Sequence, residues 1–225
     1  MTFVGKPYGD FAQPPVLLEH WEFDAIQRDI TTVLPDGCRD LIIWRGKGVR
    51  PQCFVTDLAT GCDQVPVSAG DHFNGFRLHP GVQVDVDGLL ASLEDGLDDV
   101  SISARLHDYA TPLPQVVEAL ACLASGVTSV GDAAAMLGVR LRSLQRLLKR
   151  ETGQAPVFWL RLARARQAVA RLGHAEALAD LACDSGYADQ AHMTREFRRW
   201  FGTTPHRIRA DAGWVTRNFV AGYGA

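Results

Sequence analysis

Two groups of basic and amide side chains are spaced so that each would line one face of a helix. The first group comprises Arg142, Gln145, Arg146 and Lys149, and residues three and four apart are neighbours on a helix surface. Arginine can bind guanine through two hydrogen bonds, glutamine can bind adenine in the same way, and other basic side chains can contact phosphate. The pattern therefore predicts a helix face suited to binding a polyanion whose bases are accessible.

The second group belongs to an internal repeat with an offset of 49 residues. Residues 146–156 read RLLKRETGQAP and residues 195–205 read REFRRWFGTTP, and both fit R-x-[LF]-[KR]-R-x-x-G-x-x-P. His192, Arg195 and Arg199 are expected on the outer side of the second helix. A short helix rich in Ala and Leu that ends in glycine precedes each copy, so the pattern indicates a duplicated helix-turn-helix.

The elements that would position these faces are helices from Gln115 onward. Ser129 and Asp132 form an N-terminal capping signal, and Gly138 stops that helix. The next helix is expected from Leu141 to Gly153, and Asp189 is the expected N-cap of its repeat. The side chains expected to face inward are Leu141, Leu144, Leu147, Leu148, Met193, Phe197, Trp200 and Phe201.

A helix from Pro156 to about Leu172 is expected between the two copies. Seventeen residues at about 1.5 Å each make a rod of roughly 25 Å. Such a rod could hold the two outer faces about 34 Å apart, so that both reach successive major grooves on one side of a duplex.

The first half of the chain has a different pattern, with short apolar segments separated by Gly, Pro and Asp. The expected strands are 31–34, 40–44, 52–56, 64–67, 73–78 and 82–86. Short strands at this spacing favour a small antiparallel barrel or sandwich. The fold class predicted for the whole chain is α+β, with this β-rich region followed by an all-α domain that contains two helix-turn-helix units.

The net charge changes sign at the same place in the chain where the strand pattern gives way to the helical pattern. Residues 1–114 contain 8 Lys/Arg and 17 Asp/Glu, a net charge of -9, whereas residues 115–225 contain 15 Lys/Arg and 9 Asp/Glu, a net charge of +6. Only the second half is therefore suited to a polyanion. The expected domains are 1–90, β-rich; 91–114, a linker with a short helix near Ile102–Tyr109; 115–210, DNA-binding; and 211–225, a C-terminal tail.

Other reactive side chains in the first half give weaker signals. Asp36, Cys38, Arg39 and Asp40 crowd one turn, but no neighbouring base would activate the thiol, so a turn that shapes a hairpin is favoured. Arg77 and His79 are candidates for lining the mouth of a pocket. The spacings of Cys53, Cys62, His72 and His79 match no ligand pattern, so no metal and no catalytic residue are predicted.

The repeat and its flanks closely resemble the DNA-binding domain of the AraC/XylS family of transcription regulators. The matching stretches are LGVRLRSLQRLLKRETGQAP and LACDSGYADQAHMTREFRRWFGTTPHRIR, within about residues 115–210. The resemblance implies that one recognition helix presents Arg142, Gln145 and Arg146 to base edges, and that the other presents Gln190, His192 and Arg195. Arg140 departs from the family, which usually has a small capping residue there.

In the first half, VLPDGCRDLIIW and FRLHPG resemble an uncharacterised β-rich domain that often precedes AraC-type DNA-binding domains. The resemblance implies a transcription regulator whose first domain senses an effector or dimerises. Two alternatives remain: an enzyme with a catalytic β-barrel tethered to a DNA-binding domain, and an architectural protein that binds any duplex.

Composition sets further limits on the class of protein. The chain is 47% hydrophobic and 22% charged, which excludes a largely disordered protein. The pattern shows neither a membrane span nor a signal peptide, so a cytoplasmic location is expected. Five cysteines without a CxxC pair favour reduced thiols. The expected partners are double-stranded DNA, a small-molecule effector, RNA polymerase and a second copy of the chain, with no cofactor and no membrane.

Overall fold

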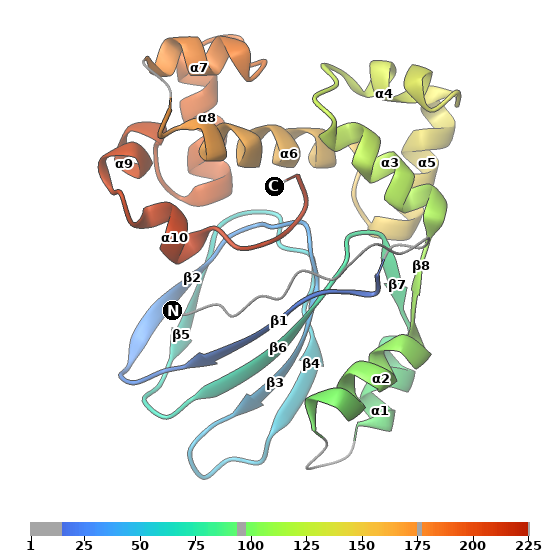
Figure 1. The fold of residues 1–225 in the computed structure, drawn as a ribbon, viewed down its shortest axis with the longest axis vertical. Coiled ribbons are helices and arrows are strands. Elements are labelled where there is room, and N and C mark those ends of the chain that lie inside the picture. Colours follow the sequence, from blue (N-terminus) through green and yellow to red (C-terminus); the bar gives the residue numbers. More distant parts are fainter. Residues whose placement is uncertain (1–14, 94–97, 175–176, 225) are drawn as a thin grey trace. The chain divides into compact units, whose positions relative to one another are not determined.

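The computed structural model describes residues 15–93, 98–174 and 177–224, which form two compact units. The sheet unit comprises the described residues up to Thr31, together with Cys38–Leu58 and Gln64–Val117. The helical unit comprises Thr32–Gly37, Ala59–Asp63 and the described residues from Glu118 onward. An antiparallel β region followed by a helical region confirms the predicted fold class (Figure 1).

The main sheet has four antiparallel strands in the order β1-β6-β3-β4. Their bounds are β1 Leu17–Asp24, β6 His72–Leu78, β3 Asp40–Arg45 and β4 Gln52–Val55. Two further pairs are β2 Asp29–Val33 with β5 Asp63–Val67, and β7 Val82–Val84 with β8 Ala110–Pro112. Strands were expected at all of these places except β1 and β8.

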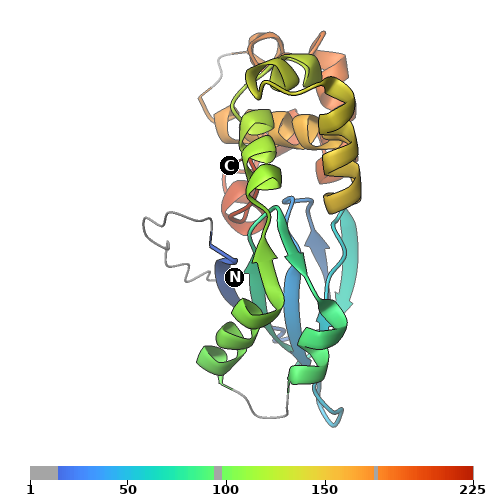
Figure 2. The ribbon, with the colours of Figure 1, turned by 90° about the vertical axis from the view of Figure 1, so that its right-hand side faces the viewer.

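One face of the main sheet packs against α1 (Val86–Ser92) and α2 (Asp99–Tyr109). Leu41 and Phe76 from the sheet join Leu89, Ile102 and Leu106 from the helices in one buried core. Figure 2 shows these two helices at one end of the β7–β8 pair. The expectation of a linker is therefore wrong for residues 98–114, because burial of Ile102 and Leu106 makes this stretch part of the sheet unit.

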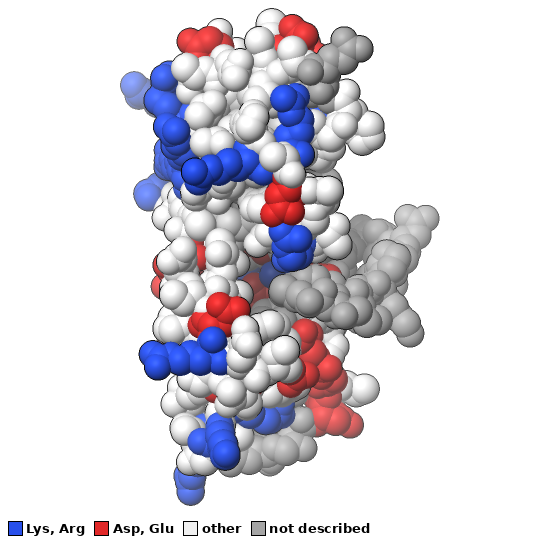
Figure 3. Space-filling view, turned by 90° about the vertical axis from the view of Figure 1, so that its left-hand side faces the viewer, with Lys and Arg blue, Asp and Glu red and all other residues white. Residues whose placement is uncertain are grey.

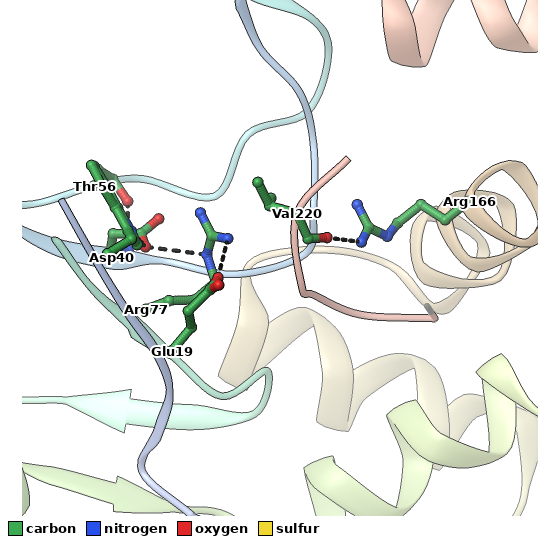
Figure 4. A network of polar contacts seen from close by, with 7 residues as sticks. Glu19, Asp40, Thr56, Arg77, Arg166 and Val220 are labelled. Atoms are coloured by element: carbon green, nitrogen blue, oxygen red, sulfur yellow. Dashed lines mark hydrogen bonds and ion pairs between the residues drawn. The ribbon is translucent and has the colours of Figure 1, made fainter. Parts of the chain in front are cut away.

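The other face of the sheet carries a buried ion cluster formed by Glu19, Asp40 and Arg77. Arg77 Nη1 donates to Glu19 Oε2 at 3.2 Å, and Arg77 Nε lies 3.2 Å from Asp40 Oδ1 (Figure 4). The three side chains come from neighbouring positions of β1, β6 and β3, and each residue is at most 8% exposed. Arg77 is thus buried between two carboxylates.

Trp21 completes this face by lying across Gly75 on the neighbouring strand. Its indole N–H donates to Asp40 Oδ1 at 2.9 Å. A Cβ at Gly75 would lie 2.0 Å from the indole ring, so only glycine leaves room for it. β1 was missed because its LLEHWEFD sequence contains three acidic residues, of which Glu19 is buried through its pairing with Arg77.

The helical unit contains two pairs of helices, each a short helix followed by a long one. One pair precedes the central helix α6 in the chain and the other follows it. Its helices are α4 Val130–Met136, α5 Leu141–Thr152, α6 Pro156–Arg171, α7 Leu178–Asp184, α8 Gln190–Phe201, α9 Pro205–Ala210 and α10 Trp214–Asn218. α3 (Pro114–Ala124) leads into the unit. Across the described residues, no helix combines the length and apolar character needed to cross a membrane.

The last described residues close the core of the helical unit, whereas the sequence predicted only a tail from residue 211. Tyr223 is 6% exposed; its hydroxyl donates to Leu120 O at 3.1 Å, and its ring packs edge-on against Trp159. Arg166, only 1% exposed, donates to Val220 O at 2.7 Å (Figure 4) and lies over the Phe219 ring. Aromatic packing and a buried guanidinium therefore fix this segment.

Candidate nucleic-acid interface

The two helix pairs α4–α5 and α7–α8 are structural copies of one another. The first helix of each pair has 7 residues and the second has 12. α5 and α8 begin and end at positions that differ by the offset of the sequence repeat. The turns are residues 137–140 and 185–189, so the second is one residue longer. The structure confirms a duplicated helix-turn-helix, with unequal turns.

Local capping explains where these helices begin and end. The Asp132 N–H donates to Ser129 Oγ at 3.1 Å, and the His192 N–H donates to Asp189 Oδ1 at 2.6 Å, so both predicted N-caps are confirmed. α5 follows Arg140, whose side chain makes no capping hydrogen bond. Gly153 and Gly202 end the two long helices in the left-handed conformation, with φ of 70° and 65°.

The inner faces of α5 and α8 are apolar as predicted, except that Leu147 is only partly buried and Leu141 is exposed. The residues of these two helices that are at most 3% exposed are Leu144, Leu148, Met193, Phe197, Trp200 and Phe201. Leu141 was expected inside but is 44% exposed, because it lies in the first turn of α5, on the outer side. Gln190 holds the equivalent position in α8.

The outer face of α5 carries the predicted side chains in an accessible arrangement. Arg142, Gln145 and Arg146 are exposed, and their side chains make no hydrogen bond or ion pair with the part of the chain that the structure describes. Lys149 Nζ donates to Gly153 O at 2.7 Å at the end of the helix. Three polar groups are therefore available to an external ligand.

The outer face of α8 forms a surface pocket lined by Gln190, Ala191, Thr194, Arg195 and Arg198. Gln190 and Arg195 were predicted, whereas Arg198 was missed. The signal was available, since Arg198 stands 49 residues after Lys149 and so occupies the equivalent position. Arg195 likewise corresponds to Arg146, which gives each long helix an arginine at the same place.

His192 and Arg199 were also predicted here, but both engage neighbouring groups within the helical unit. His192 Nδ1 accepts the Ala188 N–H at 3.3 Å, and its ring packs edge-on against Tyr187 at 5.4 Å. The Arg199 guanidinium lies 4.9 Å from the centre of the Trp200 ring. His192 thus helps to shape the turn before α8, and neither residue lines the α8 pocket.

Charge gathers on the same part of the molecule. Figure 3 shows Lys and Arg side chains along one edge of the helical unit. The basic residues of α5 and α8 are exposed at Arg142, Arg146, Lys149, Arg150, Arg195, Arg198 and Arg199. Such a surface attracts a polyanion, and its attraction weakens as salt rises.

Among the described residues of the first half, the turn that contains Cys38 is held by hydrogen bonds to Thr56. Cys38 is buried, Arg39 Nε donates to Thr56 O at 2.9 Å, and the Asp40 N–H donates to Thr56 Oγ1 at 2.8 Å, so this turn has a structural role. Burial lowers the pKa of His79, whose Nδ1 lies 2.7 Å from Pro80 O.

A different group meets the distance criterion for metal ligands among the described residues. His20, Glu22 and Asp99 place ligand atoms within 4.8 Å of one another. The amide of Asn74 already joins His20 Nε2 at 2.6 Å to Asp99 Oδ1 at 2.8 Å. Two members of the group are therefore joined by hydrogen bonds.

Comparison with known proteins finds similarity over the helical half. A family model described as a helix-turn-helix domain matches residues 133–211. The HTH-type transcriptional activator RhaS of Klebsiella pneumoniae (strain 342) is 37% identical over 79 residues, which are 35% of this chain and 28% of RhaS. The chain thus matches little more than a quarter of the length of that relative.

Two solved structures each match a little less than half of the chain. A transcriptional regulator with an AraC-type DNA-binding domain from Chromobacterium violaceum is 27% identical, with a TM-score of 0.39 over 43% of this chain and 90% of its own. The DNA-binding domain of AdpA, solved in complex with a target DNA, is 28% identical, with a TM-score of 0.36 over 44% and 87%.

Proposed function

We propose that this chain is a sequence-specific, DNA-binding transcription regulator of the AraC/XylS family, because residues 133–211 match a helix-turn-helix family model and 79 residues are 37% identical to the activator RhaS. The observation that carries the proposal is the pair of equivalent helices, α5 and α8, whose outer faces offer arginine and glutamine side chains that make no hydrogen bond or ion pair with the described residues. Each helix would enter the major groove of one segment of the duplex.

The contacts divide into two kinds. The proposed base contacts come from Arg142, Gln145, Arg146, Gln190, His192 and Arg195. Lys149 and Arg199 would contact phosphate, and Arg198 joins the proposed contacts because it lines the α8 pocket. Phosphate contacts supply affinity through release of counterions, whereas the base contacts supply sequence preference.

Selection from a random pool of duplexes tests this function directly. We expect the full chain to enrich one sequence and to bind it at least about 10³-fold more tightly than a random duplex at physiological salt. If about six phosphates are neutralised, the logarithm of the binding constant should fall with the logarithm of salt concentration with a slope of about -5. Equal affinity for all duplexes would indicate an architectural protein, and no binding at low salt would refute the proposal.

We further propose that the sheet unit either senses a small molecule or mediates dimerisation. Its support is the resemblance of two motifs that the structure brings together: Asp40 of VLPDGCRDLIIW pairs with Arg77 of FRLHPG. Native mass spectrometry of the full chain should show either a bound mass that is lost on denaturation or a dimer. A monomer without bound mass, even after incubation with cell metabolites, would contradict both roles. RNA polymerase is the further partner that an activator would need.

A further inference from the structure

One polar stripe of α6 holds neighbouring elements of the helical unit. Arg164 Nη2 donates to Thr128 O at 3.2 Å, Gln167 Nε2 donates to Ala124 O at 2.7 Å, and Arg171 Nη2 lies 3.2 Å from Asp184 Oδ2. The three side chains are three and four residues apart, so they share one face of the helix. Their targets lie at the end of α3, in the loop before α4 and at the end of α7.

Arg164 is the member of this stripe that contacts both helix-turn-helix units. On one side it binds the carbonyl of Thr128, whose Oγ1 donates to Asp132 Oδ2 in the first turn of α4. On the other side its guanidinium lies 5.8 Å from the centre of the Tyr187 ring, in the turn between α7 and α8. A Cβ at Gly186 would lie 3.6 Å from the Arg164 Nε, so the guanidinium also lies beside that glycine.

The Tyr187 contact extends to the start of the second long helix. Tyr187 is 5% exposed, and its ring meets the edge of His192 in the first turn of α8. α4 packs against α5 and α7 packs against α8. A shift of Thr128 or of Tyr187, the two groups that Arg164 contacts, would therefore also move the outer face of α5 or of α8.

We propose that Arg164 is a positioning residue that sets the separation and angle of α5 and α8, and thereby the spacing of the two DNA segments that the chain recognises. This inference rests on the proposed function. A planar guanidinium can donate to a carbonyl and stack on an aromatic ring at the same time, whereas a lysine ammonium supplies a single mobile charge. Lysine should therefore replace arginine poorly.

Arg161 offers a matched control, because it lies one turn earlier on α6, is exposed, and makes no hydrogen bond or ion pair with the described residues. Arg164→Ala, Arg164→Lys and Arg161→Ala would be compared with the wild type on the selected duplex. Three altered duplexes complete the set: one with a single base pair inserted between the two segments, and two with either segment scrambled.

The inserted base pair moves one segment by about 3.4 Å and turns it by about 35°. Wild type and Arg161→Ala should lose about tenfold or more in affinity from the insertion, because two rigidly held helices no longer fit together. The insertion should lower the affinity of Arg164→Ala and Arg164→Lys by less than about threefold. On the scrambled duplexes, the affinities of these variants should match that of the wild type within about twofold. An equal loss on every duplex would mean a general structural role and would overturn the proposal.

A second measurement needs no DNA. Spin labels attached by a chemistry other than thiol coupling, at the equivalent positions Gln145 and Thr194, report the distance between α5 and α8. Pulsed electron paramagnetic resonance should give a narrow distribution for wild type and Arg161→Ala, and a broader or shifted one for Arg164→Ala. An unchanged distribution would overturn the role of Arg164. If the wild type selects no sequence, the proposed function fails, and this measurement still decides whether Arg164 positions the helices.

Discussion

Replacing Arg77 with methionine is expected to lower the free energy of unfolding of the sheet unit by about 3–5 kcal/mol at pH 7, because it leaves Glu19 and Asp40 buried without their counterion. Methionine keeps much of the side-chain volume, so a cavity contributes little. Urea unfolding followed by hydrogen exchange at β1, β3 and β6 would localise the loss. Arg45→Met is the control, since Arg45 is a partly exposed arginine of β3 and should change stability by less than about 0.5 kcal/mol.

The dependence of this loss on pH follows from Glu19. Burial raises the pKa of Glu19, and the attraction of Arg77 opposes that rise. A carboxyl whose pKa is higher in the folded state costs stability as pH rises from its unfolded value through its folded value. Without Arg77 the folded pKa rises further, so the variant should recover part of its deficit as pH falls toward about 4.5. A deficit that is the same at every pH would show that Arg77 acts through packing alone.

Removing the two equivalent arginines, Arg146→Ala with Arg195→Ala, is expected to have the largest effect on DNA binding. Each arginine that grips a guanine contributes about 1–3 kcal/mol. The residues lie on different helices, so the two losses should add to about 2–6 kcal/mol on the selected duplex. Fluorescence anisotropy on labelled duplexes measures this change at fixed salt.

The control for this experiment removes the same charge from the sheet unit, through Arg28→Ala with Arg50→Ala. Both residues are exposed. The control should bind the selected duplex almost as the wild type does. If the Arg146 and Arg195 variant loses the same amount of affinity for random and selected duplexes, these arginines contact phosphate. If it loses affinity for neither duplex, the outer faces of α5 and α8 do not contact DNA.

The sequence predicted the helical unit better than the sheet unit, and the reason is physical. α5 and α8 are specified locally, by a 3.6-residue apolar pattern and by glycines that stop each helix at Gly153 and Gly202. In contrast, β1 depends on partners 48 to 61 residues away, among them Arg77, which pairs with the buried carboxylate of Glu19. Its sequence alone shows no apolar stripe that would reveal a strand.

The acidic stretch before α3 was misjudged for a related reason. Asp98 looks like a solvated linker residue, yet it accepts the Ser101 N–H as the N-cap of α2. This helix buries Ile102 and Leu106 against the sheet. In the helical unit, Arg198 was missed and Leu141 was wrongly expected inside, because periodicity fixes a helix face only to within about one residue. The equivalent positions in the repeat, Lys149 and Gln190, place both residues on the outer face.

The unequal outer faces of α5 and α8 give the proposed complex a direction. At corresponding positions α5 carries Leu141, Arg142 and Gln145, whereas α8 carries Gln190, Ala191 and Thr194. Two identical readers related by a two-fold axis favour a palindrome, which is the same from either end. A single chain with two different readers instead favours a sequence that has a head and a tail. One bound copy would then point along the duplex in only one sense, and so could distinguish the genes on its two sides.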